Sequence, residues 1–127
     1  MNSTNKADSN VVIIDYGLGN LFSIKRACET VGLSTIITSS KNDIAEAKAI
    51  ILPGVGAFGN AMASLNKLDL VEIIQNICVS DKPVIAICLG MQLLMSASSE
   101  HGYYKGLNIV NGKVKRLDDQ NGDIDCE

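Results

Sequence analysis

The sequence lacks tryptophan altogether and contains only five other aromatic residues, three Tyr and two Phe. With so few aromatic side chains, a core must be built from Ile, Val, Leu and Ala, a composition typical of sheets covered by helices. Hydrophobic residues make up 46% of the 127 residues and charged residues 20%. This ordinary globular balance can fill one domain and no more.

No charge of one sign dominates, and no long apolar run occurs. The formal net charge is −3 with Lys and Arg scattered, so nothing indicates a surface for nucleic acid or an anionic membrane. No apolar run approaches the ~18 residues that a membrane-spanning helix needs. The first ten residues are polar and lack the apolar core of a secretion signal. We therefore expect a cytoplasmic protein without membrane association.

Histidine is nearly absent, and the four cysteines form no C-x-x-C pair. Since His101 is the only imidazole, a Cys/His zinc site is not expected, and we predict neither a metal nor a cofactor. Cys28 and Cys78 fall on apolar faces of predicted helices, which favours core positions. Cys126 lies in a polar stretch and supports no argument. Cys88 alone follows a predicted strand directly.

Short apolar runs alternate with helical patterns. Strands are predicted at 11–15, 34–38, 49–52 and 84–87, and helices at 21–31, near 43–47, at 61–79 with a break near Asp69, and at 89–97. This order predicts an α/β fold with a parallel, flavodoxin-like sheet flanked by helices. After a loop at 102–106, residues 107–117 are expected to form a strand pair that turns at Asn111-Gly112.

Two polar segments flank this pattern. Residues 1–10 are expected to be a disordered tail. Residues 118–127 contain five acidic residues and no apolar periodicity, so they are expected to be an acidic tail. The domain itself is therefore expected to span residues 11–117.

Three glycine-containing turns follow predicted strands, at residues 16–20, 53–59 and 88–90. In an open parallel sheet the carboxyl ends of the strands meet at one edge, where active sites lie. We therefore expect the three turns to lie side by side.

Residues 86–90, Ala-Ile-Cys-Leu-Gly, join a buried strand directly to a helix. A nucleophile at Cys88 would sit on a tight turn with its side chain above the sheet. Small residues at Ala86 and Gly90 would let strand and helix backbones approach closely, and the helix N-terminus favours the reactive thiolate. A buried structural cysteine fits this spacing equally well, so spacing alone does not separate the two interpretations.

Residues 54–59, Gly-Val-Gly-Ala-Phe-Gly, match the G-x-G-x-x-G pattern of dinucleotide sites. The pattern follows the third predicted strand instead of the first. The acidic residue expected about 20 residues later would fall before the next strand begins. A loop whose backbone N–H groups face a developing anion is the better interpretation.

His101 has to be considered as the base for Cys88, because no other imidazole exists. A helix that begins at Cys88 would carry His101 about 15–20 Å from the thiol, at 1.5 Å per residue. We therefore predict that His101 is a surface loop residue, and that the chain offers a nucleophile and an anion-binding loop without a base.

Several segments together resemble the glutaminase subunits of imidazole glycerol phosphate synthase, which are class I glutamine amidotransferases. They are residues 15–21 (DYGLGNL) followed by Ser23, residues 53–58 (PGVGAF), residues 87–92 (ICLGMQ), and the later Gly106-Leu107 and Gly112-Lys113-Val114. The match runs from about residue 11 to residue 117. The C-L-G-x-Q segment is shared by many class I amidotransferases, whereas the D-Y-G-x-G-N-L opening is more specific.

The resemblance implies hydrolysis of L-glutamine to glutamate and ammonia. The ammonia would pass to a (βα)8-barrel cyclase subunit that makes imidazole glycerol phosphate in histidine biosynthesis. By resemblance, Cys88 is the catalytic nucleophile, and the backbone N–H groups of Val55 and Leu89 form the oxyanion hole. Gln92 and the backbone of Gly54 would bind the substrate.

The resemblance also places the turn at residues 15–20 at the cyclase interface. Two departures from the family stand out. Ala86 replaces a usual glycine, and the family extends roughly another third to a catalytic His and Glu near its C-terminus, so the domain is expected to be incomplete there. Two alternatives stay open: a paralogue that supplies ammonia to a surface-sugar synthetase, and a non-catalytic truncated chain that binds a partner.

Overall fold

The computed structural model describes residues 11–117, so the tails expected at 1–10 and 118–127, with Cys126, lie outside the described residues. The elements follow in the order β1 (Val11–Ile14), α1 (Leu21–Thr30), β2 (Thr35–Thr38), α2 (Lys41–Glu46), β3 (Ala49–Leu52), α3 (Phe58–Lys67), α4 (Val71–Cys78), β4 (Val84–Ala86), α5 (Leu89–Leu93), β5 (Met95–Ser98), β6 (Tyr104–Lys105) and β7 (Val110–Val114). The longest helices, α1 and α3, have ten residues each, and none in this range could cross a bilayer.

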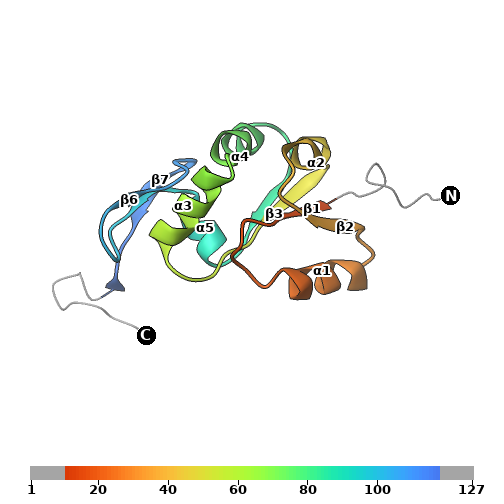
Figure 1. Ribbon diagram of the computed structural model, residues 1–127, viewed down its shortest axis with the longest axis horizontal. Helices are drawn as coiled ribbons and strands as arrows, with labels where there is room; N and C mark the ends of the chain where they lie inside the picture. Colours follow the sequence, from red (N-terminus) through yellow and green to blue (C-terminus); the bar gives the residue numbers. More distant parts are fainter. Residues whose placement is uncertain (1–10, 118–127) are drawn as a thin grey trace.

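The first four strands form one parallel sheet in the order β2-β1-β3-β4. Helices α2 and α4 lie on one side of this sheet and α1 on the other (Figure 1). All four residues of β1 are buried, as a central strand covered on both faces requires. The predicted α/β sheet flanked by helices is confirmed.

Successive side chains of each strand point to opposite faces of the sheet, and this alternation divides the core into two clusters. Val12 and Ile50 point to the side of α2, α3 and α4 and join the larger cluster. Ile13 and Ile51 point to the other side and pack with residues of α1. Ile85 of β4 pairs with Ile51 and so shares this second side, yet it is 57% exposed because α1 contacts β1 and β2 instead. The apolar surface of β4 on the α1 side is therefore open.

Residues 95–98 form strand β5, and the helix predicted to continue to Ala97 is wrong beyond Leu93. The carbonyl groups of residues 93–96 accept hydrogen bonds from the N–H groups of residues 106–110, at 2.8–3.0 Å. A longer helix would need these carbonyl groups for its own bonds. Pairing with a distant segment therefore overrides the local helical pattern.

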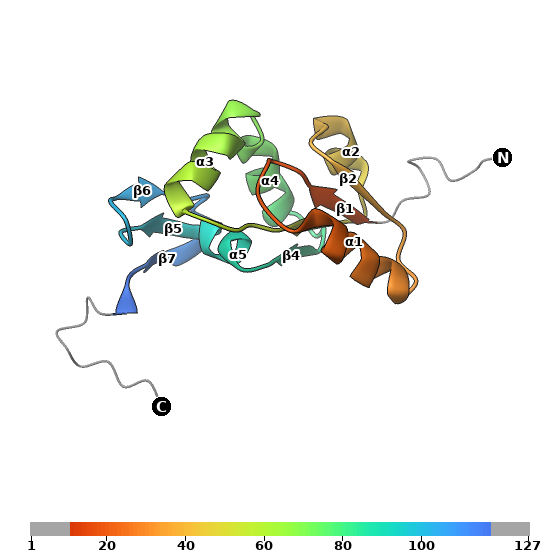
Figure 2. The same cartoon turned by 60° about the horizontal axis from the view of Figure 1, so that its bottom comes forward.

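Strand β5 lies between β6, antiparallel, and β7, parallel, in a second sheet of order β6-β5-β7. Figure 2 shows this sheet at one end of the molecule, with α5 between it and β4. The predicted turn at Asn111-Gly112 is wrong, since both residues lie inside β7. The predicted break near Asp69 is confirmed, because α3 ends at Lys67 and α4 begins at Val71.

Candidate active site

The three glycine-containing turns meet at one edge of the parallel sheet, as the sequence predicts. The phenol of Tyr16 donates a hydrogen bond to the carbonyl oxygen of Pro53 at 2.5 Å. A Cβ built on Gly19 would lie 3.1 Å from the Cβ of Pro53, and one built on Gly54 would lie 2.8 Å from the nitrogen of Gly90. The three turns are therefore in contact.

Cys88 occupies a strained turn between β4 and α5. Its φ of 58° and ψ of −124° lie in a region that residues with a side chain rarely adopt. The neighbouring backbone is fixed on both sides, by a hydrogen bond from Ile87 N to Leu52 O at 2.9 Å and one from Met91 N to Cys88 O at 2.9 Å. Such a strained strand-to-helix turn presents a nucleophile above a sheet.

Gly90 makes this turn possible because its backbone lies against the end of β3. A Cβ at this position would overlap the carbonyl oxygen of Leu52 and lie 2.9 Å from its carbonyl carbon. The predicted need for a small residue at 90 is confirmed. Ala86, where the resembling family usually has glycine, is the last residue of β4 and pairs with Leu52.

The cysteines of the described residues differ in exposure. Cys28 is buried between α1 and the sheet. Cys78 is half-buried against the larger core cluster, and this burial raises the pKa of its thiol. Cys88 is exposed. Cys28 is therefore a core residue as predicted, Cys78 packs against the core but is only half-buried, and Cys88 is the described thiol that solvent can reach.

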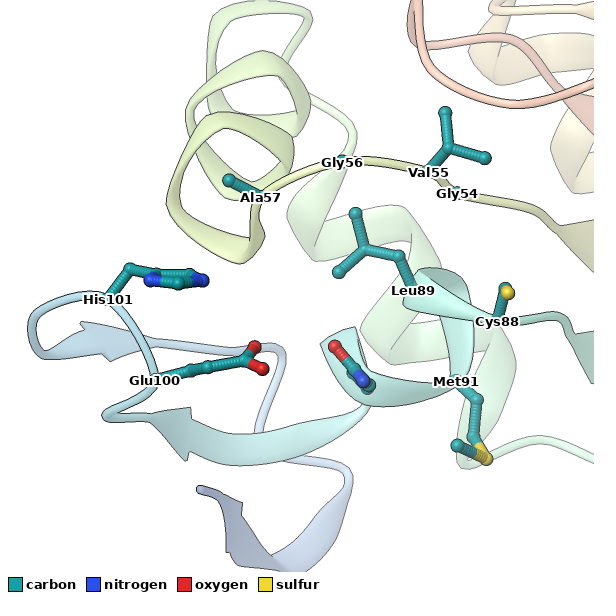
Figure 3. A pocket seen from close by; sticks show the side chains of 10 residues that line it. Gly54, Val55, Gly56, Ala57, Cys88, Leu89, Met91, Glu100 and His101 are labelled. Carbon is teal, nitrogen blue, oxygen red and sulfur yellow. The ribbon is translucent and has the colours of Figure 1, made fainter. Parts of the chain in front are cut away.

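A cavity of about 680 Å³ opens beside Cys88 and is called the Cys88 cavity below. It is lined by residues 54–57 of the loop after β3, by Cys88, Leu89, Met91 and Gln92, and by Glu100 and His101 of the turn after β5. Figure 3 shows Glu100 and His101 at one end of the cavity and Cys88 at the other, with the side chain of Leu89 between them. All five residues that the sequence singles out for nucleophile, oxyanion hole and substrate binding line this one cavity.

The backbone N–H groups of Val55 and Leu89 have no acceptor among residues 11–117. Gly54, which precedes Val55, is buried against α5, whereas the side chain of Val55 is 50% exposed. Two residues with unpaired N–H groups thus line the same cavity as an exposed thiol, and such N–H groups are the donors that stabilise an oxyanion.

His101 lines the Cys88 cavity, whereas the sequence analysis expects a continuous helix to carry it away from the thiol of Cys88. That argument fails because α5 ends at Leu93 and β5 turns the chain back. His101 is exposed in the turn after β5, and Figure 3 shows it at the opposite end of the cavity from Cys88, beyond Leu89. The described residues therefore place no imidazole beside the thiol.

Glu100 is the site residue that sequence reasoning missed. It contributes the only carboxylate among the residues that line the Cys88 cavity, and its side chain points across the cavity toward α5 (Figure 3). Its N–H donates to the hydroxyl of Ser98 at 3.2 Å, which helps to fix the turn. No local motif marks this residue, because only the pairing of β5 with β6 and β7 brings it to the cavity. Within residues 11–117 no three His, Cys, Asp or Glu side chains gather as a metal site would require.

Cys88 is expected to react fastest of the three described thiols with a small alkylating reagent. The reason is its exposure on the strained turn, compared with the burial of Cys28 and of Cys78. Limited treatment with iodoacetamide followed by peptide mapping measures the three rates. Labelling of Cys28 or Cys78 ahead of Cys88 would contradict the assignment of the turn as a nucleophile site.

Comparison with known proteins gives concordant results. Residues 12–125 match the family described as glutamine amidotransferase class-I. The chain is 46% identical over 110 residues to the imidazole glycerol phosphate synthase subunit HisH of Listeria monocytogenes serotype 4b, covering 87% of this chain and 53% of that protein. It is 48% identical over 104 residues to the HisH subunit of Aquifex aeolicus, covering 81% of this chain and 50% of that protein.

A solved structure titled crystal structure of glutamine amidotransferase superposes with a TM-score of 0.69 at 17% identity, covering 84% of this chain and 56% of that one. At this identity the likeness supports the fold alone. The chain spans about half the length of the curated relatives it matches. Since the family match covers almost all of the described residues, the chain belongs to the class I glutamine amidotransferase family.

Proposed function

We propose that the chain is part of the glutaminase subunit of an imidazole glycerol phosphate synthase, with residues 11–117 forming the portion of the domain that holds the nucleophile. It would hydrolyse L-glutamine in the cytoplasm and pass ammonia to a (βα)8-barrel cyclase subunit, bound at the turn of residues 15–20, in a heterodimer. The observation that carries the proposal is the exposed Cys88 on its strained turn, in one cavity with the unpaired N–H groups of Val55 and Leu89.

The geometry supports acyl transfer through a thioester. The sulfur of Cys88 would attack the side-chain amide carbon of glutamine, and the carbonyl π electrons would move to the oxygen. The N–H groups of Val55 and Leu89 would bind this oxyanion. Collapse of the intermediate breaks the C–N bond, and the nitrogen takes a proton and leaves as ammonia. Water then cleaves the thioester and releases glutamate.

Recognition of glutamine requires partners for its ammonium and carboxylate groups as well as its amide. Glu100 offers the only carboxylate of the Cys88 cavity and so suits the α-ammonium group. Gln92 and the backbone of Gly54 also line the cavity and suit the remaining polar groups. The cavity therefore suits the amide of glutamine at the Cys88 end and its α-ammonium group at the Glu100 end.

Glu100→Gln is expected to weaken L-glutamine binding by about tenfold or more, because a charge-assisted hydrogen bond contributes about 1.5–3 kcal/mol. Titration calorimetry with a Cys88→Ser background measures binding without covalent chemistry. Glu46→Gln, at the exposed end of α2, makes the same charge change away from the cavity and should leave binding unchanged. Equal affinity in the Glu100→Gln and parent chains would remove Glu100 from the substrate site.

Substrate protection tests the function as a whole. L-glutamine at millimolar concentration should slow the alkylation of Cys88 by iodoacetamide, because it would occupy the Cys88 cavity, whereas D-glutamine should have little effect. The absence of protection by L-glutamine would overturn the proposal. The paralogue that supplies a surface-sugar synthetase is not favoured, since the relatives from Listeria monocytogenes and Aquifex aeolicus are subunits of imidazole glycerol phosphate synthase.

A further inference from the structure

The aromatic ring of Tyr104 on β6 lies against the first turn of α3. A Cβ built on Gly59, the second residue of α3, would lie 2.7 Å from Cε1 and from Cζ of this ring. The ring therefore occupies the space in which a larger residue at position 59 would place its side chain. Since Tyr104 remains 46% exposed, this is a local contact between an edge strand and a helix.

The opposite edge of the same ring faces the chain segment that carries Glu100. Tyr104 pairs with Ser98 in the antiparallel register of β5 and β6, so residues 99–103, called the Glu100 turn below, connect the two partners. A Cβ built on Gly102 in this turn would lie 3.5 Å from Cε2 of the ring. The ring of Tyr104 therefore contacts α3 with one edge and lies beside the Glu100 turn with the other.

A second, smaller cavity of about 90 Å³ lies behind the Glu100 turn, on the side of α3. It is lined by residues 57–60, Ser98, Glu100, His101 and Tyr104. Glu100 and His101 also line the Cys88 cavity, so their turn is a wall between two open spaces. A wall with few atoms behind it lacks the packing contacts that hold a side chain in place. The ring of Tyr104 supplies such contacts, because it adjoins both Gly59 and Gly102.

We propose that Tyr104 is a positioning residue for substrate binding, whose ring holds the Glu100 turn away from α3 and so keeps the carboxylate of Glu100 in the Cys88 cavity. The inference rests on the proposed function, because it presumes that Glu100 binds the α-ammonium group of L-glutamine. Without the ring, the turn can move into the smaller cavity, and the carboxylate leaves the position from which it points toward α5 (Figure 3). The Cys88 turn would stay in place, because its own hydrogen bonds join it to β3 and α5.

The test measures the affinity of the 127-residue chain for L-glutamine by titration calorimetry, in the Cys88→Ser background. Tyr104→Ala is expected to weaken binding about tenfold, which approaches the loss expected for Glu100→Gln itself. Tyr104→Phe keeps the ring carbons that adjoin Gly59 and should leave the affinity unchanged. Tyr103→Ala is the matched control, because it removes the neighbouring phenol, whose ring lies 5.8 Å from Nζ of Lys113, and it should also leave the affinity unchanged.

A double-mutant cycle with Glu100→Gln separates positioning from a general loss of structure. If Tyr104 acts through Glu100, Tyr104→Ala weakens binding in the parent chain but has little further effect in the Glu100→Gln background. A merely structural role predicts instead that the two losses multiply. Gly59→Ala provides a second route, should Tyr104→Ala fail to fold. Its Cβ would displace the exposed ring, whereas alanine is itself favoured in a helix, so the variant should fold and bind L-glutamine more weakly.

Three results would overturn the role of Tyr104 while leaving the proposed function intact. They are an unchanged affinity in a folded Tyr104→Ala or Gly59→Ala variant, an equal loss in Tyr104→Phe and Tyr104→Ala, and losses that multiply in the cycle with Glu100→Gln. An unchanged affinity in Glu100→Gln alone would overturn it as well, because Tyr104 would then have no ligand group to position. A parent chain that does not bind L-glutamine would instead contradict the proposed function, and the role of Tyr104 with it.

Discussion

Replacement of Gly90 by alanine is expected to lower the free energy of unfolding by about 2–3 kcal/mol. The new Cβ would overlap the carbonyl oxygen of Leu52 and lie 2.9 Å from its carbonyl carbon. Neither atom can rotate away, because both belong to the backbone of central strand β3. Alanine is favoured over glycine inside a helix by about 1 kcal/mol, which offsets only part of the cost of overpacking.

Urea denaturation measures this loss as a fall in the transition midpoint of about 1 M or more. Gly32→Ala is the matched control, because Gly32 has a φ of +89° but open space where the Cβ would be. It should cost about 1 kcal/mol for backbone strain alone. Equal losses in the two variants would show that the contact between the Cys88 turn and β3 is looser than described.

The open side of β4 should increase the effect of Gly90→Ala on the fraction of unfolded chain. Ile85 and Ile87 are 57% and 38% exposed, so part of the apolar surface that could stabilise the sheet remains in water. A chain of these 127 residues is therefore expected to begin with a small free energy of unfolding. A loss of about 2–3 kcal/mol would then leave a substantial unfolded fraction at 25 °C.

The parallel sheet and the Cys88 turn were predictable because short stretches of sequence indicate both. The run at residues 11–14 has no polar position, which only a strand covered on both faces requires. Glycine at 90 marks the place where strand and helix backbones touch, and the direct step from the strand ending at Ala86 to a helix leaves Cys88 no relaxed conformation. The sequence signals for these features are local, although the contact that excludes a Cβ at Gly90 is with Leu52 of β3.

The second sheet and the distal wall of the Cys88 cavity were not predictable in the same way. The segment Met95–Ser98 has no strong intrinsic preference for strand over helix, and its conformation follows from hydrogen bonds with residues 106–110. Glu100 and His101 reach the cavity only through this pairing. The wrong end predicted for the helix after Cys88 therefore placed His101 too far from the site, and no local signal drew attention to Glu100.

Ammonia release from glutamine by a chain of these 127 residues is expected to be at least about a thousandfold slower than by the same chain supplied with a complementary base, even with the proposed cyclase partner present. The scale follows from the loss seen when one member of a catalytic triad is removed. An ordinary thiol is only a few per cent ionised at neutral pH. The leaving nitrogen also needs a proton, and water needs a base to attack the thioester.

The described residues supply the nucleophile and two N–H donors without the proton carrier. His101, the one imidazole of the printed sequence, lies at the far end of the Cys88 cavity, beyond Leu89 (Figure 3). A side chain placed there is better suited to the distal part of a substrate than to its amide. The oxyanion site alone would leave a small residual rate.

The measurement is ammonia release with the cyclase present, before and after addition of a separate fragment that carries the C-terminal His and Glu of the resembling family. Appearance of activity only with the fragment would support a divided catalytic site. His101→Ala should then change turnover by less than about tenfold, since its role would be limited to substrate contact. Full activity without the fragment that is lost in His101→Ala would contradict this division, because the base would then have to approach Cys88 across the cavity.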